Sequence, residues 1–241
     1  KVRARSQSGE EWTADLLIGA DGYRSVVRAH VAPEQPDADY AGYVVWLSQS
    51  EIPEAWRRRV RGIDFMSGES NLLAVYPLIE PDGDFHRYGW GWFDPSHNRL
   101  LREIGAVRDG KVQHTPRAAD IPDAVYQSLE RQAGKWGEPW RTGLVEAICQ
   151  REIIATPISE YVPERVVRGH VALVGDAAHA QSPMTGAGFE EAVQDALALA
   201  STLRAQPDPT MALPLYEHAR LSDMRRRVQG GEAFASMLTA A

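Results

Sequence analysis

The pattern of apolar and polar positions predicts alternating strands and helices at both ends of the chain. Near the start, Val2 and Ala4 alternate with arginines, and the apolar run 15–18 precedes a short helical segment, 25–31. Near the other end, 170–174 is a short apolar strand. A loop containing glycine and proline leads from it into a long helix. The two ends therefore share one strand–turn–helix pattern.

The long helix has apolar residues on one face at helical spacing, the pattern of an amphipathic helix. Those residues are Phe189, Ala192, Val193, Ala196, Leu197, Ala200 and Leu203. Pro207 and Pro209 end this helix, because proline removes a backbone donor and clashes with the preceding turn. The segment 215–238 is expected to be helical again, despite Gly230 and Gly231.

The middle of the chain is rich in β-branched and aromatic residues, which favour strands. Strands are expected near 41–48, 72–79 and 85–93, and the Pro-Asp-Gly-Asp sequence at 81–84 is the turn between the last two. This spacing predicts an antiparallel sheet. The following segment, 94–148, is predicted to be helical and irregular.

Because both ends of the chain predict an α/β structure, they are expected to form one domain that the sheet-rich middle interrupts. The predicted fold class is therefore α/β plus α+β. A Rossmann-like domain would contain 1–38 and 150–241, and an inserted antiparallel-sheet domain would contain 39–149. No internal repeat stands out, which argues against a solenoid.

The composition is that of a globular protein with a substantial core. Of the 241 residues, 44% are hydrophobic and 24% are charged, which excludes intrinsic disorder. The single cysteine, Cys149, excludes a disulfide scaffold and favours a reducing, cytoplasmic location. No apolar run approaches the ~20 residues of a membrane helix. A formal net charge of −7 argues against a nucleic acid as the main partner.

The first candidate motif is Asp21-Gly22, which follows the first buried strand. The strand delivers Asp21 to its carboxyl end, Gly22 permits a tight turn, and the next helix presents unpaired N–H groups. An α/β fold binds polar ligands at such a position, and an anion would be stabilised there. An ordinary strand–turn–helix, with Asp21 as the helix cap, explains the same residues equally well.

The second candidate motif begins at Gly175-Asp176, again where a strand ends, and the small residues that follow allow close backbone approach. Pro183 stiffens the loop, and the Gly-Ala-Gly sequence at 186–188 opens the long helix. A helix start with few side chains can place its positive end against a negatively charged group. A loop without a ligand is the weaker explanation, because so many small residues cost conformational entropy.

Together the motifs resemble the paired Asp-Gly and Gly-Asp motifs of FAD-dependent aromatic hydroxylases of the p-hydroxybenzoate hydroxylase type. The resemblance covers 12–31 and 165–205 closely, and the order and separation of the motifs fit the family. The stretches 40–46 and 74–77 look most like the salicylate and dihydroxypyridine hydroxylase branch. This resemblance implies an FAD-binding domain, present in part, with an inserted substrate domain.

By this resemblance FAD is the cofactor, and the second motif provides most of its contacts. Asp176 would hydrogen-bond the ribityl chain, and Pro183 would lie by the flavin ring. The backbone around 186–188 would face the N1–C2=O edge, where reduced flavin carries negative charge. The implied cofactor-binding residues of this motif are Gly175, Asp176, Pro183, Gly186, Ala187 and Gly188.

The first motif has a smaller implied role. Asp21 and Gly22 would help to hold FAD and would influence the binding of NAD(P)H. Arg28 is expected to support the motif through an ion pair rather than to contact a ligand. A departure from the family is Phe189-Glu190 in place of a Leu-Asn or similar pair. The charge of Glu190 could weaken the positive field felt by the flavin.

A larger departure is that no G-x-G-x-x-G sequence follows an opening strand in these 241 residues. The family carries this fingerprint, which holds the FAD pyrophosphate, at its N-terminus. Lys1 opens what resembles the middle of a domain, so we expect a longer protein of which the N-terminal part is missing here. The 241-residue piece alone is not expected to bind FAD tightly or to be active.

The resemblance implies a monooxygenase in which NAD(P)H reduces FAD and oxygen forms a flavin C4a-hydroperoxide that transfers its distal oxygen to an electron-rich ring. The substrate would be a small phenolic or hydroxylated N-heteroaromatic compound. Neither a nucleic acid nor a membrane is expected as a partner, and a homodimer is a candidate assembly. The alternatives are epoxidation or halogenation on the same fold, and a non-catalytic remnant or interaction module.

The sheet-rich middle is the candidate cover of the flavin. Alternation along its last predicted strand places four side chains on one face: His86, Tyr88, Trp90 and Trp92. Gly89 and Gly91 lie on the other face and leave space for a bulky group. Tyr76, His86 and Tyr88 are the candidate substrate-binding residues. Alternatively, the aromatic residues pack the sheet against the helical layer.

His179 lies close to Asp176 in the chain and is a candidate catalytic residue, together with Pro183. It could donate a proton, contact the ligand or belong to the structure of the loop. No third ligand at a recognisable spacing accompanies Asp176 and His179, so no metal site is expected. A serine hydrolase is excluded, because the sequence has no G-x-S-x-G motif.

Overall fold

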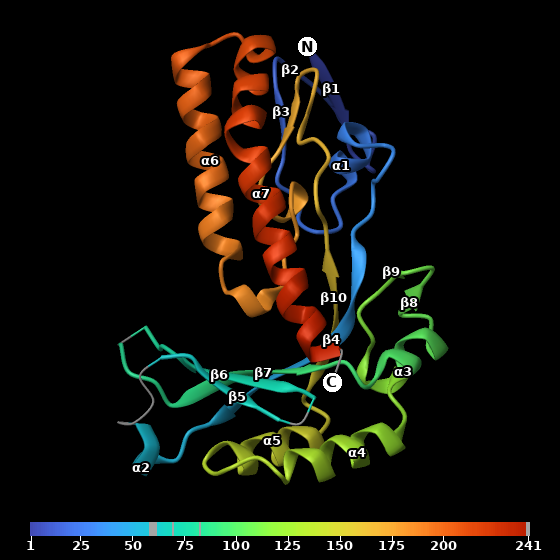
Figure 1. Ribbon diagram of the computed structural model, residues 1–241, viewed down its shortest axis with the longest axis vertical. Helices are drawn as coiled ribbons and strands as arrows, with labels where there is room; N and C mark the ends of the chain where they lie inside the picture. Colours follow the sequence, from blue (N-terminus) through green and yellow to red (C-terminus); the bar gives the residue numbers. More distant parts are fainter. Residues whose placement is uncertain (58–61, 69, 82, 240–241) are drawn as a thin grey trace. The chain divides into compact units, whose positions relative to one another are not determined.

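The structure of the protein, a computed structural model, describes residues 1–57, 62–68, 70–81 and 83–239. The chain divides into two compact units. The first is built from Lys1–Ala41 and Ser159–Met237, and the second centres on Gly42–Ile158. The first unit therefore combines the blue start of the chain with its orange and red end (Figure 1). Within the described part of the chain, none of the helices combines the length and the hydropathy that crossing a bilayer requires.

The first unit contains a three-stranded sheet in the order β11-β12-β3. The central strand β12 (Val171–Leu173) pairs in parallel with β3 (Leu17–Gly19) and antiparallel with β11 (Val167–Arg168). Because β3 and β12 are parallel, their carboxyl ends lie at the same edge of the sheet. A separate antiparallel hairpin of β1 (Val2–Arg5) and β2 (Glu11–Ala14) precedes β3.

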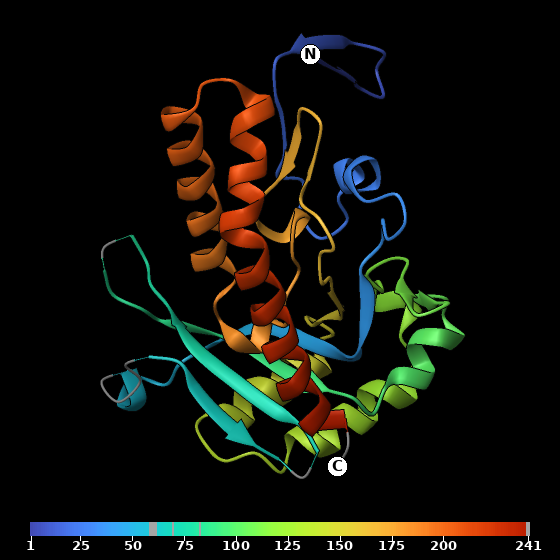
Figure 2. The ribbon, with the colours of Figure 1, turned by 45° about the horizontal axis from the view of Figure 1, so that its top comes forward.

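Helices pack around this sheet. α1 (Val26–Val31) follows β3, and the long helices α6 (Gly188–Ala205) and α7 (Pro209–Thr239) lie side by side in both ribbon views (Figures 1 and 2). Two short 3-10 turns, Gly175–Ala177 and Pro183–Thr185, connect β12 to α6. The predicted second helix is confirmed, because α7 continues through both of its adjacent glycines.

Specific hydrogen bonds attach α7 to the sheet. The hydroxyl of Tyr216 donates to the carbonyl oxygen of Leu173 at 2.8 Å. The carboxylate of Glu217 accepts from the backbone N–H groups of Val166 and Val167, at 2.7 and 2.9 Å. These contacts hold α7 against the end of β12, where the second motif begins.

The face of α6 that the apolar spacing selects is not the face that this structure buries. Glu191, Asp195 and Leu199 are the buried residues of the helix. Phe189 and Leu197, from the predicted apolar face, are 84% and 59% exposed. Part of this apolar face is therefore exposed, because α6 turns two carboxylates inward to meet basic groups on α7.

The second unit is built on a five-stranded sheet in the order β10-β4-β7-β6-β5. Its strands are β4 (Asp39–Glu51), β5 (Asp64–Ser67), β6 (Leu72–Leu78), β7 (Arg87–Asp94) and β10 (Ile154–Glu160). The pairs β4–β7, β7–β6 and β6–β5 are all antiparallel, which confirms the predicted sheet. The predicted turn at 81–84 includes residue 82, which lies outside the described residues.

Helices α4 and α5 cover one side of this sheet (Figure 1). The helical and short elements of the unit are α2 (Glu54–Arg57), α3 (Asn98–Glu103), β8 (Val107–Arg108), β9 (Lys111–Val112), a 3-10 turn (Ala118–Asp120), α4 (Asp123–Ala133) and α5 (Trp140–Cys149). The segment predicted to be helical and irregular therefore contains helices, one small hairpin and turns.

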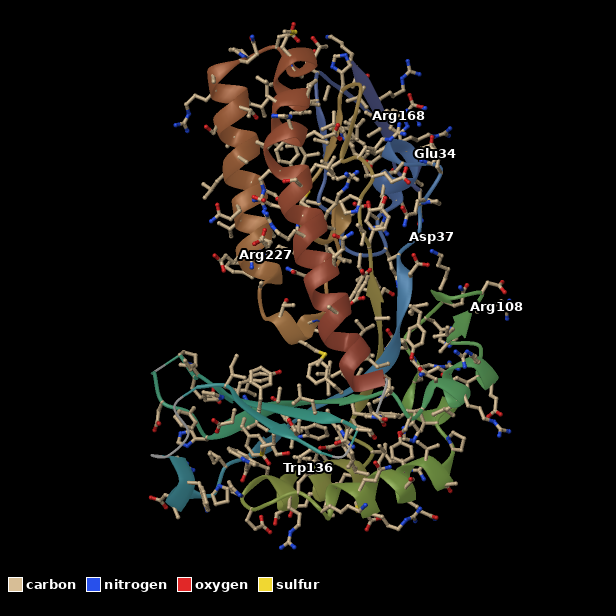
Figure 3. The ribbon with its side chains drawn as sticks, viewed as in Figure 1. Glu34, Asp37, Arg108, Trp136, Arg168 and Arg227 are labelled. Carbon is tan, nitrogen blue, oxygen red and sulfur yellow. The ribbon has the colours of Figure 1, made fainter. Side chains whose placement is uncertain are left out.

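Aromatic residues of β7 fill the space between the sheet and these helices. Tyr88, Trp90 and Trp92 have no exposed surface. The ring of Tyr88 meets Trp140 edge to face, with centroids 4.8 Å apart. Trp92 meets Trp136, which Figure 3 labels, in the same way at 6.2 Å. The alternative in which the aromatics pack the sheet against a helical layer is confirmed.

Candidate functional site

The two predicted ligand-binding turns lie next to each other at one edge of the three-stranded sheet. Gly19 ends β3 two residues before Asp21, and Leu173 ends β12 two residues before Gly175. Gly19 and Leu173 are partners in the parallel ladder. The two turns are therefore neighbours in space, although most of the chain separates them in sequence.

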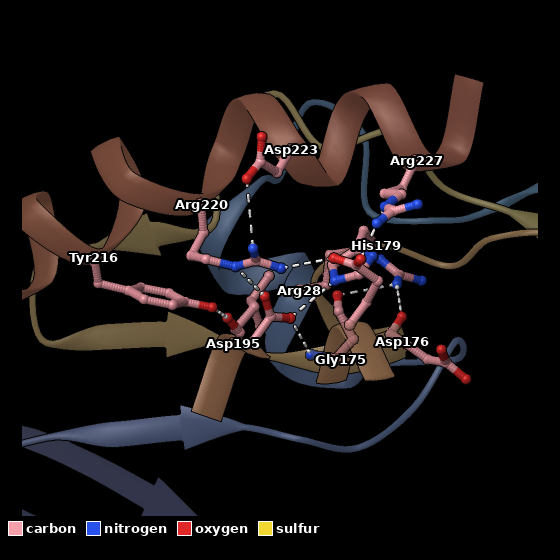
Figure 4. A network of polar contacts seen from close by, with 12 residues as sticks. Arg28, Gly175, Asp176, His179, Asp195, Tyr216, Arg220, Asp223 and Arg227 are labelled. Atoms are coloured by element: carbon pink, nitrogen blue, oxygen red, sulfur yellow. Dashed lines mark hydrogen bonds and ion pairs between the residues drawn. The ribbon is translucent and has the colours of Figure 1, made fainter. Parts of the chain in front are cut away.

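Arg28 joins the two turns (Figure 4). Its guanidinium donates to the carbonyl oxygen of Tyr23, beside the first turn, at 2.5 Å. It also donates to the carbonyl oxygens of Asp176 and Ala177 in the second turn, at 3.4 and 3.2 Å. Its Nε donates to the carbonyl oxygen of Pro36 at 2.8 Å, and the residue is only 1% exposed. The contacts that give Arg28 its supporting role here are hydrogen bonds to main-chain carbonyls.

Asp21 caps the helix that follows it. Its carboxylate accepts from the hydroxyl of Ser25 at 2.5 Å and from the backbone N–H groups of Val26 and Val27 at 2.8 and 3.3 Å. Partial burial opposes ionisation of Asp21, but these hydrogen bonds outweigh it and lower the pKa of the carboxyl. The prediction that α1 presents unpaired N–H groups is wrong for Val26 and Val27. Ser25 is the N-cap residue of α1, and Asp21 stabilises the same helix start from outside the helix.

Gly175 and Asp176 form the turn that leaves β12. Gly175 has a φ of +59°, a left-handed conformation that glycine adopts at little cost. A Cβ at this position would lie 3.2 Å from the Cβ of Ala192 on α6, so glycine also permits close packing. The Asp176 side chain is exposed, and its carboxylate points away from the neighbouring polar network (Figure 4). The turn thus presents the Asp176 carboxylate at the sheet edge.

The start of α6 carries small residues, and two N–H groups there are already paired: that of Gly186 donates to the carbonyl oxygen of Pro183 at 3.1 Å, and that of Ala187 to Oγ1 of Thr185 at 3.3 Å. Its N-cap residue, Ala187, makes no capping hydrogen bond through its side chain. Gly186 has a φ of +64°, and a Cβ there would meet no described atom within 4 Å. At Gly188 the nearest atom to a Cβ would be Nε2 of Gln181, at 3.8 Å. Pro183 is exposed nearby. This open surface fits the approach of the negatively charged edge of a flavin.

A buried polar network lies behind this loop and links α6 to α7 (Figure 4). Asp195 accepts hydrogen bonds from the N–H of Gly175 at 2.9 Å and from Nε2 of His179 at 2.8 Å. Arg220 donates to Asp195 at 2.9 Å and to Glu191 at 2.8 Å. Asp195 and Glu191 are 0% and 4% exposed. Their charges are compensated by hydrogen-bonded basic groups, as buried charges require.

His179 belongs to this network. It is 1% exposed, and its Nδ1 has no hydrogen-bond partner among the described residues. Of its three predicted roles, these contacts support a place in the structure of the loop. Within the described part of the chain, no group of three potential metal ligands occurs.

The structure does not bring the three predicted substrate residues to one surface. Tyr88 lies in the core, where its hydroxyl donates to the carbonyl oxygen of Trp140 at 3.4 Å, and burial raises its pKa to about 12. Tyr76 lies on the other face of the sheet, opposite its cross-strand partner Gly89. His86 immediately precedes β7, and its side chain is 49% exposed.

The space predicted over the glycines of β7 is filled by neighbouring side chains. A Cβ at Gly89 would lie 2.5 Å from the ring of Tyr76. A Cβ at Gly91 would lie 3.3 Å from Leu47 and from Val45. These glycines make room for side chains of their own sheet, and the bulky group that approaches Gly89 is the ring of Tyr76.

Gly89→Ala is expected to destabilise the protein by about 1–3 kcal/mol, because the added methyl group overlaps the Tyr76 ring. Thermal unfolding of the product of the complete gene measures this effect. In a Tyr76→Ala background, Gly89→Ala should destabilise the protein much less, because the ring that the methyl group would overlap is absent. An equal cost in both backgrounds would show that Tyr76 does not cover Gly89.

A buried carboxyl on β10 was missed by the sequence predictions. Glu160 is 6% exposed, and its Oε1 has no hydrogen-bond partner among the described residues. Burial, with a further contribution from the charge of Glu232, raises the pKa of Glu160 to about 7. The next residue, Tyr161, forms a backbone bridge with Ala180. Glu160 therefore lies beside the loop that carries Pro183.

Glu160→Gln is expected to stabilise the protein more at pH 8 than at pH 5. The folded-state pKa is about 7 and the reference value is 4.5, so the folded protein retains a proton that the unfolded chain releases. Stability is therefore lost as the pH rises between these two values, and glutamine avoids this loss. Melting temperatures at both pH values measure the effect. Glu164→Gln, at an exposed neighbour, is the control, and an equal effect of Glu160→Gln at both pH values would contradict the raised pKa.

Comparison with known proteins places the chain among flavoproteins. Residues 143–229 match the family model described as FAD binding domain. The chain is 33% identical over 230 residues to the aurachin C monooxygenase/isomerase of Stigmatella aurantiaca, covering 94% of this chain and 52% of that protein. It is 31% identical over 218 residues to the FAD-dependent urate hydroxylase of Klebsiella pneumoniae, covering 90% and 50%. The chain spans about half the length of these curated relatives.

Solved structures share its fold. HpxO of Klebsiella pneumoniae, complexed with FAD and uric acid, aligns with a TM-score of 0.75 at 26% identity, over 98% of this chain and 55% of that one. The 2,6-dihydroxypyridine-3-hydroxylase of Arthrobacter nicotinovorans aligns with a TM-score of 0.82 at 22% identity, over 98% and 61%. The predicted fold class is confirmed, and FAD is the cofactor that these relatives support. The chain is thus similar over most of its length to FAD-dependent monooxygenases and hydroxylases.

Proposed function

We propose that the whole protein hydroxylates a small phenolic or hydroxylated N-heteroaromatic compound with NAD(P)H and oxygen. One atom of O2 enters a C–H bond of the ring, and the other leaves as water while NAD(P)H is oxidised to NAD(P)+. Relatives named for urate and for 2,6-dihydroxypyridine support this substrate class. The observation that carries the proposal is the adjacency of the Asp21 turn and the Gly175-Asp176 turn, which Arg28 joins.

FAD, when bound, supplies the redox chemistry that activates oxygen. The exposed Asp176 would accept a hydrogen bond from a ribityl hydroxyl, and Pro183 would lie beside the flavin ring. The backbone around 186–188 would face the edge where reduced flavin carries negative charge. Asp21 and Gly22 would act through the shape of their turn, because the Asp21 carboxylate already holds the start of α1.

We assign the cofactor to the first compact unit and the substrate to the second. The corresponding ranges predicted from the sequence are 1–38 with 150–241 for FAD, and 39–149 for the substrate. Tyr76 and His86 are the proposed substrate contacts, whereas Tyr88 acts in packing. His179 acts through the loop rather than as a proton donor. A cytoplasmic location and a homodimer stay predictions from the sequence.

The experiment that tests this function uses the product of the complete gene. Purified protein should absorb at about 450 nm, as bound flavin does. Phenols and hydroxypyridines are then screened for oxidation of NADH and of NADPH, with oxygen consumption recorded in parallel. Mass analysis should find one added oxygen atom in the product of an active compound.

The outcomes separate the proposal from its alternatives. A product with an epoxide or a halogen would show a flavoprotein that catalyses epoxidation or halogenation instead of hydroxylation. A colourless protein that does not take up added FAD would instead favour the non-catalytic remnant or interaction module. The control is a reaction mixture without oxygen, in which no hydroxylated product should form.

A further inference from the structure

Three hydrogen-bond donors converge on one buried side chain, Asp195, whose exposure is 0%. Its Oδ2 accepts from the N–H of Gly175 at 2.9 Å and from Nε2 of His179 at 2.8 Å. Its Oδ1 accepts from Nε of Arg220 at 2.9 Å. Figure 4 shows that these donors come from the turn after β12, from the loop behind it and from α7. A carboxylate suits this position, because both of its oxygens accept and neither donates.

Arg220 supplies the counter-charge that lets Asp195 remain a buried carboxylate. Its side chain is 11% exposed and is hydrogen-bonded to Glu191 as well as to Asp195. Burial opposes the charge of Arg220, but hydrogen bonds to Glu191 and Asp195 outweigh it and raise its pKa. Arg220 also lies 3.6 Å from Asp223, and Arg227 pairs with Glu191 at 2.9 Å, so the network is difficult to alter at one member alone.

We propose that Asp195 is the positioning residue of the FAD site: its carboxylate holds the left-handed turn at Gly175, and through it the direction of the Asp176 carboxylate. The same carboxylate holds the ring of His179 with its proton on Nε2, which leaves Nδ1 as the acceptor in the neutral ring. This inference rests on the proposed function, because Asp176 is the residue expected to bind the ribityl chain.

Asp195→Asn tests this role because an asparagine cannot satisfy all three donors. If its amide oxygen faces Arg220, the NH2 group faces the N–H of Gly175 and Nε2 of His179. His179 can move its proton to Nδ1, so that Nε2 accepts from the NH2 group. The N–H of Gly175 has no such alternative and loses its acceptor. If the amide is turned the other way, the NH2 group faces the guanidinium of Arg220. The first orientation keeps the charged donor paired, so it is the expected one.

The matched control is Tyr216→Phe. Tyr216 is also fully buried, and its hydroxyl donates one hydrogen bond to Leu173 at the end of β12. Its loss should lower thermal stability without releasing the Gly175 turn. A general loss of packing in this region would affect FAD binding equally in both variants, whereas loss of positioning would affect it only in Asp195→Asn.

The experiment compares three proteins made from the complete gene: wild type, Asp195→Asn and Tyr216→Phe. FAD is removed and titrated back, and 15N-labelled histidine reports the tautomer of His179 by NMR. Asp195→Asn should raise the dissociation constant of FAD at least tenfold and move the His179 proton to Nδ1. Tyr216→Phe should leave that constant within about twofold and the tautomer unchanged, at a comparable loss of melting temperature.

Equal weakening of FAD binding in both variants, or an unchanged tautomer in Asp195→Asn, would overturn the inference and leave the proposed function standing. Failure of the wild type to bind FAD would overturn both. If Asp195→Asn does not fold, the double variant with Arg220→Met removes the buried cation whose charge Asp195 no longer balances. This double variant should fold, and its dissociation constant for FAD should be at least tenfold higher than that of the wild type. An FAD affinity equal to that of the wild type would overturn the inference.

Discussion

Replacing Asp176 with alanine in the product of the complete gene is expected to weaken FAD binding about ten- to a hundredfold. This range corresponds to the ~1.5–3 kcal/mol of hydrogen bonds to a charged group. The side chain is exposed at the carboxyl end of β12, and among the described residues its carboxylate has no hydrogen-bond partner. Removal of the Asp176 side chain should therefore weaken FAD binding and change the free energy of unfolding little. Titration of the FAD-free protein, followed by flavin fluorescence, measures the change.

The control for this prediction is Asp15→Ala. Asp15 is also an exposed aspartate of the first unit, lying just before β3, with a side-chain exposure of 79%. The substitution Asp15→Ala changes the net charge by the same amount as Asp176→Ala and should leave the dissociation constant of FAD unchanged. Equal effects of the two substitutions would mean that Asp176 acts only through overall charge and does not contact the cofactor.

Arg28→Met is expected to lower the free energy of unfolding by about 3 kcal/mol or more, and the melting temperature by roughly 10 °C. Methionine has a similar length but no donors, so four carbonyl oxygens lose a hydrogen-bond donor. These are the oxygens of Tyr23, beside the first turn, of Pro36, and of Asp176 and Ala177 in the second turn. The substitution also removes the stacking of the guanidinium over the ring of Tyr161, at 4.3 Å.

The control is Arg24→Met, four residues earlier. Arg24 is exposed and lies over the ring of Tyr23 at 5.3 Å, so its loss should change the melting temperature by no more than a degree or two. FAD should in turn restore part of the stability lost in Arg28→Met, because ligand binding favours the folded state. Equal melting temperatures for the two variants would contradict the role of Arg28 as the link between the turns.

The course of the chain through both motifs could be predicted because local rules decide it. A short apolar strand ends in Gly175-Asp176, and small residues with one proline then lead into a helix. The left-handed φ at Gly175 and at Gly186 is what glycine permits at such turns. β3, near the start of the chain, pairs in parallel with β12, near its end.

The inward face of α6 could not be predicted from its apolar spacing, because its buried residues are chosen by partners on another helix. Glu191 and Asp195 are buried since Arg220, 29 and 25 positions away, pairs with both. The periodicity within one segment does not indicate a charged partner on another helix. For the same reason the contact of His179 with Asp195 could not be predicted from the sequence.

The burial of Tyr88 could not be predicted for a different reason. Alternation correctly placed Tyr88 with Trp90 and Trp92, but it does not say which layer covers that face. Helix α5 covers it, and Gly143 of that helix lies so close to Tyr88 that a Cβ there would be 2.3 Å from its hydroxyl. The glycine opposite, Gly89, receives the ring of Tyr76 from the neighbouring strand.

The central claim is that the turn at Gly175-Asp176 and the start of α6 hold FAD, and a crystal structure of the complete gene product with FAD tests it most directly. The account predicts that the Asp176 carboxylate lies within hydrogen-bonding distance of a ribityl hydroxyl. It also predicts that the backbone at 186–188 faces the N1–C2=O edge of the flavin. FAD bound elsewhere, with the Asp176 carboxylate in contact with solvent alone, would contradict the account.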